Sequence, residues 1–191
     1  MFRPLVLIGI SEHKLEMDND IIAEAVLERK ELRMSDNPQD TLSEDSYFPM
    51  KVPECKRLIE EVDSLIQEVV HPDLKTVNQW AHILEPNEQT MFHNHGQLGK
   101  MPGISWVYYP EVPKNSGNIV WTFEANAQRM VEEAVPEVGK LILFGQNVPH
   151  FTKKNISGEQ RISISGNAVV ENPTKDFNPG ALLNYVGLFR G

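Results

Sequence analysis

The chain has 191 residues, of which 40% are hydrophobic and 24% are charged, a balance typical of a globular protein with a buried core. Its net charge of −9 argues against a general binder of nucleic acid, because such a protein needs a basic face to displace counterions from phosphates. We therefore expect no nucleic-acid partner.

The first apolar segment, from Pro4 to Ile10, predicts an edge strand or a packing strand. It is too short for the core of a signal peptide or for a membrane span, and acidic residues follow it closely. The single cysteine, Cys55, excludes an internal disulfide and suits a reducing compartment. We therefore expect a cytoplasmic protein with no membrane partner.

Two helices are predicted in the first third of the chain. Asp20 to Arg33 places its apolar residues on one face, with Asp18 or Asn19 as the cap. A second helix starts at Pro53, and its apolar residues are spaced three and four apart. These residues are Cys55, Leu58, Ile59, Val62, Leu65, Ile66 and Val69. Because Cys55 belongs to this stripe, we interpret it as a buried structural thiol rather than a nucleophile. The polar stretch from Ser35 to Pro53 predicts a long surface connection.

From residue 73 the chain changes to short strand-like runs separated by turn residues. The runs are Thr76 to Leu84, Gln89 to His95, Ile104 to Tyr109, Asn118 to Phe123, Lys140 to Phe144 and Arg161 to Val170. Strands at this spacing, with Pro and Gly between them, favour a mainly β fold, an antiparallel sandwich or jelly roll whose flanking helices brace one sheet. Ala125 to Ala134 predicts a short helix inserted at one end of the barrel.

We expect one domain over residues 1–191. Within it, residues 1–72 supply the N-terminal strand and supporting helices, residues 73–170 the jelly-roll core, and residues 171–191 a C-terminal tail. The tail mixes Pro, Asn and Gly with apolar residues, so we expect it to pack on the surface of the domain or on a second subunit of a homodimer.

Three of the six histidines are spaced for a metal site. His93 and His95 are two residues apart, so both side chains point to the same face of an extended strand. His150 follows an apolar run and a turn-like Gly145-Gln146-Asn147, which brings it back over that face. Imidazoles bind Fe, Zn, Cu and Ni, so the residue types leave the metal open. The other histidines have no such partners at motif spacing and are interpreted as structural or solvated; they are His13, His71 and His82.

The last predicted strand carries polar residues on one face. These residues are Arg161, Ser163, Ser165 and Asn167. Taken alone, the pattern is typical of an exposed strand with a solvated face. The alternative is a pocket wall, with Arg161 offering a rigid pair of donors to a carboxylate and Ser163 a further donor. Arg161 comes eleven positions after His150, enough for a turn and a return along the neighbouring strand. This spacing favours a carboxylate anchor near a metal.

Together these motifs resemble those of the 2-oxoglutarate and Fe(II)-dependent oxygenases of prolyl-hydroxylase-like type, especially a branch found in bacteria and their viruses. The resemblance extends from Trp80 to Asn167, under half of the chain. It rests on His93-Asn94-His95, Gly103-Ile104-Ser105-Trp106-Val107-Tyr108-Tyr109, Ser116-Gly117-Asn118, Gly139-Lys140-Leu141-Ile142-Leu143-Phe144, Pro149-His150 and Arg161-Ile162-Ser163-Ile164-Ser165-Gly166-Asn167.

The resemblance implies a double-stranded β-helix in which His93 and His150 bind iron. It also implies a pocket for 2-oxoglutarate, whose distal carboxylate is held by Arg161 with Ser163. Tyr108 or Tyr109 adds a hydroxyl to that pocket, and Asn167, on the same strand face, is counted with the co-substrate residues. The implied activity is an oxygenase that consumes O₂ and 2-oxoglutarate and hydroxylates an unactivated C–H bond of a small-molecule or protein substrate.

His95 departs from the pattern of the wider superfamily, because most such oxygenases carry His-x-Asp and this chain carries His-x-His. Three neutral ligands leave the metal more positive and make Zn(II) a competitor of Fe(II). Two other hypotheses therefore stay open. One is a three-histidine cupin-type metalloenzyme, a dioxygenase or a zinc hydrolase that uses no 2-oxoglutarate. The other is a non-catalytic metal-binding module.

Overall fold

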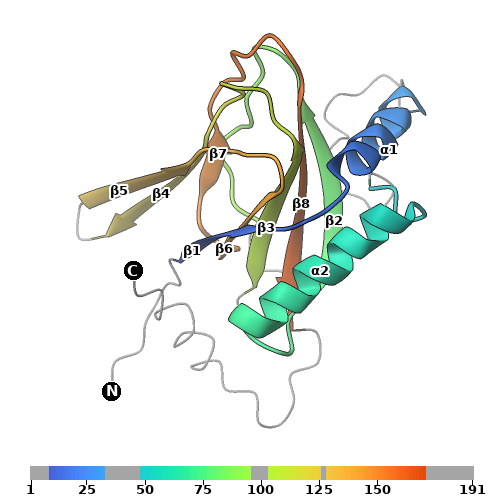
Figure 1. Cartoon of the computed structure of the whole chain (residues 1–191). Coiled ribbons are helices and arrows are strands. Elements are labelled where there is room, and N and C mark those ends of the chain that lie inside the picture. The colour runs from blue at the N-terminus through green and yellow to red at the C-terminus, as the bar shows by residue number, and fades with distance from the viewer. Residues whose placement is uncertain (1–8, 33–47, 96–102, 126–127, 171–191) are drawn as a thin grey trace.

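The computed structural model describes residues 9–32, 48–95, 103–125 and 128–170, which form eight strands and two helices (Figure 1). In chain order these elements are β1 (Ile10–Lys14), α1 (Asn19–Leu32), α2 (Pro53–Val69), β2 (Lys75–Leu84), β3 (Ile104–Glu111), β4 (Ile119–Ala125), β5 (Gln128–Ala134), β6 (Lys140–Gly145), β7 (His150–Thr152) and β8 (Arg161–Val169).

The strands form two antiparallel sheets. The larger sheet has the order β1-β6-β3-β8-β2, and the smaller has the order β5-β4-β7. A single bridge between His93 and His150 adds the segment before β3 to β7. The chain after β2 thus crosses repeatedly between the two sheets, which is the arrangement of a double-stranded β-helix. The predicted mainly β jelly roll is confirmed.

The larger sheet separates two apolar clusters, because side chains alternate between the faces of each strand. Trp106 and Tyr108 of β3 belong to the cluster that α1 and α2 cover. Val107 and Tyr109 of the same strand belong to the cluster between the two sheets. On β8, Ile162 lies in the helix-covered cluster, so its neighbour Arg161 faces the interior between the sheets.

Both predicted helices are confirmed. Helix α2 begins at Pro53, whose fixed φ suits the first helical turn and whose missing N–H has no helical partner there to lose. Its predicted stripe packs against the larger sheet, and Leu58 and Cys55 are fully buried. Burial raises the pKa of the Cys55 thiol to about 12, as expected for a structural thiol. At the start of α1, Asp18 caps the helix by accepting the N–H of Ile21 at 3.3 Å.

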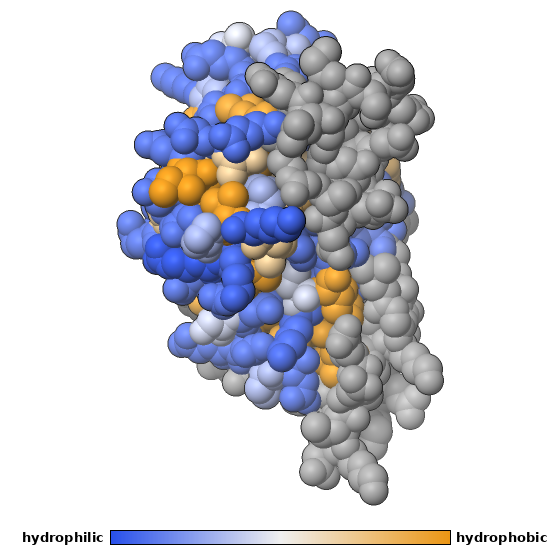
Figure 2. Space-filling model, turned by 90° about the vertical axis from the view of Figure 1, so that its right-hand side faces the viewer, coloured by the Kyte–Doolittle hydropathy of each residue, from blue (hydrophilic) through white to orange (hydrophobic). Residues whose placement is uncertain are grey.

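On the side of α1 and α2, the part of the surface formed by described residues is mostly hydrophilic, with hydrophobic residues in separate patches (Figure 2). In the ranges that the structure describes, neither helix is long and apolar enough to cross a membrane. The apolar faces of the helices are therefore used to cover the larger sheet.

The first strand lies later in the chain than predicted. Of the range from Pro4 to Ile10, only residues 9 and 10 are described, and β1 runs from Ile10 to Lys14. Pairing with β6 fixes its position, because Ile10 lies opposite Phe144 and packs with it between the sheets. The predicted polar connection lies outside the described residues up to residue 47, and so does the whole C-terminal tail.

The prediction of a helix over Ala125 to Ala134 is wrong. Gln128 to Ala134 form β5, which pairs with β4 along its whole length without a register shift. Alanine and glutamate favour a helix locally, but cross-strand pairing with a neighbouring apolar strand overrides this preference.

The prediction of a strand over Gln89 to His95 is also wrong, since this segment makes only the bridge at His93. Hydrogen bonds from backbone to side chains replace the regular backbone hydrogen bonds of a strand pair there. The N–H of Thr90 donates to Thr152 Oγ1 at 2.9 Å, and the N–H of Thr152 donates to Thr90 Oγ1 at 2.7 Å. We call this reciprocal pair the threonine clip. The partner strand, β7, has three residues and therefore no alternation long enough to predict.

Candidate metal centre

The three predicted histidines lie together where the interior between the sheets meets the surface, with His93 exposed, His95 half-buried and His150 buried. One ring nitrogen from each of His93, His95 and His150 lies within 4.8 Å of those of the other two. The ring centroids are 4.4 Å apart for His93 and His150, 5.0 Å for His95 and His150, and 5.3 Å for His93 and His95. Three nitrogens this close together can bind one divalent metal ion.

Backbone hydrogen bonds place these residues, although no regular strand carries the first two. The N–H of His93 donates to the carbonyl of His150 at 3.0 Å, and the N–H of His150 donates back at 2.8 Å. The N–H of His95 donates to the carbonyl of Gln146 at 3.1 Å, in the turn that follows β6. The segment from His93 to His95 is thus tied at two points to the chain around β7.

Each histidine has an acceptor at Nδ1. His93 Nδ1 lies 2.7 Å from the carbonyl of Met91, and His150 Nδ1 lies 2.9 Å from the carbonyl of Val148. A carbonyl oxygen only accepts, so the proton must sit on Nδ1 and the lone pair on Nε2. Both rings therefore offer Nε2 to a metal, in the tautomer that a ligand needs.

The ring of His95 contacts side chains, whereas the rings of His93 and His150 contact backbone carbonyls. Its Nδ1 lies 2.7 Å from Asn167 Oδ1, and Ser105 Oγ donates to the same oxygen at 2.7 Å. The amide nitrogen of Asn167 donates to Asn78 Oδ1 at 2.9 Å. Asn167 therefore contacts His95, and its position favours a role in orienting that ring.

Burial keeps two of the imidazoles neutral. It lowers the pKa of His150 to about 3, with a partly opposing effect from the hydrogen bond to Val148. Burial also lowers the pKa of His95, against the effect of its bond to Asn167. Around them pack Phe144, whose ring centroid is 4.8 Å from that of His150, and Trp80, 5.3 Å from that of His95. The rings are thus ready to bind a metal at neutral pH without losing a proton.

Arg161 lies fully buried in the same interior, 1% exposed. Its Nη1 donates to the carbonyls of Ser116 and Gly117, at 3.2 and 2.7 Å, and its guanidinium carbon lies 5.6 Å from the centroid of the Tyr109 ring. None of the ion pairs between described residues includes it. Its Nε and the hydroxyl of Tyr109 are buried without a hydrogen-bond partner. A buried cation without an anion is costly, so this corner of the interior favours a ligand carboxylate.

The two predicted tyrosines lie on opposite sides of the larger sheet. Tyr108 faces the helices, and its hydroxyl donates to Asn19 Oδ1 at 2.5 Å, so it lies away from Arg161. Tyr109 faces the interior beside Arg161, and burial raises its pKa to about 12, which keeps the hydroxyl protonated as a donor.

Strand β2 lies beside β8 in the larger sheet and extends its polar interior face. His82 pairs with Ser163, which is buried, and Asn78 pairs with Asn167. Burial, together with the charges of Arg161 and His93, lowers the pKa of His82 to about 4. His82 therefore lines the interior between Arg161 and His93, a position that its spacing in the sequence did not indicate. The signal that could have found it is the alternation of β2 read against that of β8.

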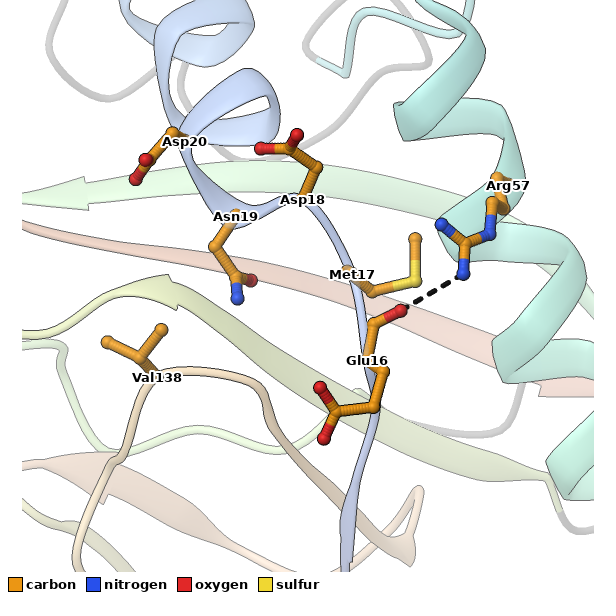
Figure 3. Close-up of a pocket in the computed structure, with 7 residues that line it drawn as sticks. All are labelled: Glu16, Met17, Asp18, Asn19, Asp20, Arg57 and Val138. Carbon is orange, nitrogen blue, oxygen red and sulfur yellow. Dashed lines mark hydrogen bonds between the residues drawn. The ribbon is translucent and has the colours of Figure 1, made fainter.

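The other histidines lie elsewhere. His13 contacts Ser11 on the edge strand β1, and His71 accepts the N–H of Asp73 in the turn before β2. A separate hollow between the start of α1 and α2 contains no predicted site residue (Figure 3). It is lined by Glu16, Met17, Asp18, Asn19, Asp20, Arg57 and Val138. There Arg57 donates to the backbone carbonyl of Glu16 at 3.0 Å.

No family model matches the chain, and no curated protein sequence matches it. Solved structures do. A prolyl-4-hydroxylase from Pseudomonas putida is 18% identical, with a TM-score of 0.57 over 83% of this chain and 86% of that chain. HygX from Streptomyces hygroscopicus, solved with nickel and 2-oxoglutarate bound, is 12% identical, with a TM-score of 0.57 over 88% and 85%. SnoK, a non-heme alpha-ketoglutarate-dependent carbocyclase from nogalamycin biosynthesis, is 12% identical, with a TM-score of 0.60 over 85% and 79%. The chain therefore shares the double-stranded β-helix fold of the non-heme 2-oxoglutarate-dependent oxygenases.

Proposed function

We propose that the protein is an Fe(II)- and 2-oxoglutarate-dependent oxygenase that hydroxylates a small-molecule or protein substrate. The observation that carries the proposal is the pairing of two features in one interior. Three imidazoles converge with ring nitrogens within 4.8 Å of one another, and a fully buried arginine with unpaired donors beside it faces the same space. A metal site alone would not need the arginine.

In this proposal His93, His95 and His150 hold the metal. Arg161 binds the distal carboxylate of 2-oxoglutarate with its free guanidinium edge, and the hydroxyls of Tyr109 and Ser163 add donors. When bound, iron, 2-oxoglutarate and O₂ would supply the oxidising chemistry, in which the co-substrate loses CO₂ to give succinate and one oxygen atom enters the substrate. The apolar walls around the imidazoles exclude water from that reaction.

The reaction type is inferred from similar folds. A prolyl-4-hydroxylase supports hydroxylation, whereas a carbocyclase of the same fold, at similarly low identity, uses the same co-substrate for another outcome. Hydroxylation is proposed because it needs only the metal centre and a positioned C–H bond. No further acid or base is required of the chain.

The second candidate is a three-histidine metalloenzyme, a dioxygenase or a zinc hydrolase, without 2-oxoglutarate. It is favoured by His95, a neutral ligand that leaves Zn(II) as a competitor of Fe(II). This candidate assigns no role to Arg161, so the two proposals differ in what they expect of that residue.

Metal content followed by anaerobic titration with 2-oxoglutarate tests the proposal. The protein should hold one Fe(II), and the loaded protein should bind 2-oxoglutarate. Calorimetry and the visible absorption of the complex measure this binding. Arg161→Leu should keep the metal and weaken 2-oxoglutarate binding by at least about tenfold, since a hydrogen bond to a charged group contributes roughly 1.5–3 kcal/mol.

Arg57→Leu is the matched control, because Arg57 pairs with Glu54 on the surface of α2. It should leave 2-oxoglutarate binding unchanged. Metal binding with no affinity for 2-oxoglutarate, or equal affinity in wild type and Arg161→Leu, would favour the second candidate instead.

A further inference from the structure

The hairpin of β4 and β5 projects from the barrel as a ribbon (Figure 1). It exposes apolar side chains on both of its faces. Met130 is 48% exposed on the face shared with Phe123, and Val131 is 56% exposed on the face shared with Thr122. At these two positions apolar side chains meet water on both faces, whereas Trp121 and Thr122 of β4 are buried. These two side chains therefore mark a surface that gains from being covered.

The outer edge of this ribbon is open. Strand β5 is the last strand of its sheet, so within the described part of the chain its outer backbone groups have no strand partner. Gln128 to Ala134 contain neither proline nor lysine and show no bulge in their register with β4, so nothing in the backbone blocks pairing at this edge. The remaining protection is charge, on Arg129, Glu132 and Glu133, which repels most strands but not one of complementary charge. The other long edge strand, β2, differs in both respects, because it begins with Lys75 and has a register shift between Thr76 and Asn78.

The charges along β5 are complementary to those of a second copy of the same strand. In an antiparallel pair with a two-fold axis at Val131, each residue before the axis faces the residue equally far beyond it. Arg129 of each copy then lies opposite Glu133 of the other, and the two Val131 side chains meet at the axis. Arg129, Val131 and Glu133 share one face of the ribbon, because side chains alternate. Glu133 already pairs with Lys153 and accepts a hydrogen bond from Asn118, but the two oxygens of a carboxylate offer about four lone-pair sites and can accept an arginine as well.

We propose that two copies of the protein associate through β5, forming one continuous six-stranded sheet from the two smaller sheets across a two-fold axis at Val131. The occupant of the open edge is thus a second copy of this chain. The pairing satisfies the outer backbone groups, covers part of Val131, and sets two Arg129–Glu133 pairs across the interface. It is independent of the metal centre and of the proposed oxygenase activity.

Sedimentation velocity over a range of protein concentrations tests the proposal. The full-length protein should show a reversible monomer–dimer equilibrium. Val131→Lys should shift it to monomer, because it sets two like charges directly opposite each other at the axis. Val135→Lys is the matched control, since Val135 is 57% exposed but lies beyond the end of β5, and it should keep the dimer. Circular dichroism and thermal unfolding check that each variant is folded.

A charge reversal fixes the register. Arg129→Glu alone and Glu133→Arg alone should each weaken self-association by at least about tenfold, because both charge pairs become repulsive. An equimolar mixture of the two variants should form a heterodimer, because every facing pair is then of opposite charge. A wild-type protein that stays monomeric overturns the proposal, and so does a dimer that Val131→Lys leaves intact. Failure of the mixture to associate would overturn the proposed pairing of Arg129 with Glu133 across the interface.

Discussion

At the scale of single residues, two substitutions of His95 decide whether it binds the metal directly or only supports the ligands. His95→Ala should lower metal affinity sharply, whereas His95→Asp should restore the commoner set of two histidines and one carboxylate and keep Fe(II). If His95 only oriented the ligands, either substitution would lower metal affinity by roughly ten- to a hundredfold. Metal content and Fe(II) affinity of the two variants decide between these cases. Equal retention of metal in both would withdraw His95 from the ligand set.

The buried imidazole of His150 should make the metal-free protein sensitive to acid. Its pKa is lowered from 6.5 to about 3 in the folded protein, so below pH 6.5 the unfolded chain takes up a proton that the folded chain does not. Stability is therefore unaffected above pH 6.5 and is lost as the pH falls from 6.5 toward 3. At pH 5 the loss should reach up to about 2 kcal/mol.

Urea unfolding of the metal-free protein at pH 7 and at pH 5 measures this effect. His150→Asn should reduce the dependence on pH, whatever it does to stability at pH 7, because one of the titrating groups is gone. His82, whose pKa burial lowers to about 4, accounts for part of the dependence that remains. An unchanged slope in the variant would show that other groups cause the acid sensitivity.

Residue spacing was enough to select the histidines that converge. His93 and His95 form a local His-x-His pattern, and His150 is marked by the apolar run and the turn that precede it. Residue spacing also selected Arg161, although the pattern alone left a solvated strand as an alternative. It could not choose between Tyr108 and Tyr109, nor could it find His82. Those assignments depend on which face of β2, β3 and β8 is interior, and that is set by pairing between segments far apart in the sequence.

At the scale of elements, the segment that carries His93 is held by the threonine clip rather than by a regular ladder. Replacing both threonines, Thr90→Val with Thr152→Val, removes two hydrogen bonds that contribute about 1 kcal/mol each. The segment should then be less well placed, and metal affinity should fall by about tenfold or more.

A competition titration of Zn(II) against a chelator measures this loss. The single variants should each show a smaller loss than the double variant. Thr122→Val is the control, because Thr122 is buried on the neighbouring strand β4 and takes no part in the clip. Equal affinity in the double variant and wild type would mean that the two backbone bonds between His93 and His150 suffice.

The same scale explains where element prediction succeeded and failed. Helix α2 was predictable because its apolar residues recur at spacings of three and four and Pro53 marks its start. The long strands β2, β3, β6 and β8 were predictable from their β-branched and aromatic runs. Strand β5 was not, because alanine and glutamate favour a helix locally and only its pairing with β4 makes it extended.

At the scale of the whole molecule, the larger sheet lies between the apolar core under the helices, which stabilises the fold, and the candidate metal centre. Leu58 lies in the cluster between α2 and this sheet, whereas Phe144 packs against His150 on the sheet's other side. The core that holds α2 in place therefore does not contact the metal centre. Damage on the helix side should lower the free energy of unfolding without changing what the site can bind.

Leu58→Ala tests this division, because Leu58 is fully buried and its truncation leaves a cavity under α2. The free energy of unfolding should fall by about 2–5 kcal/mol, the usual cost of such a truncation. Metal stoichiometry and metal affinity at a temperature where the variant remains folded should match those of wild type. Glu60→Ala, on the exposed side of the same helix where Glu60 pairs with Lys56, should change stability little. A loss of metal affinity in folded Leu58→Ala would mean that strain passes through the larger sheet, whose strand β8 carries both Ile162 toward the helices and Arg161 toward the interior.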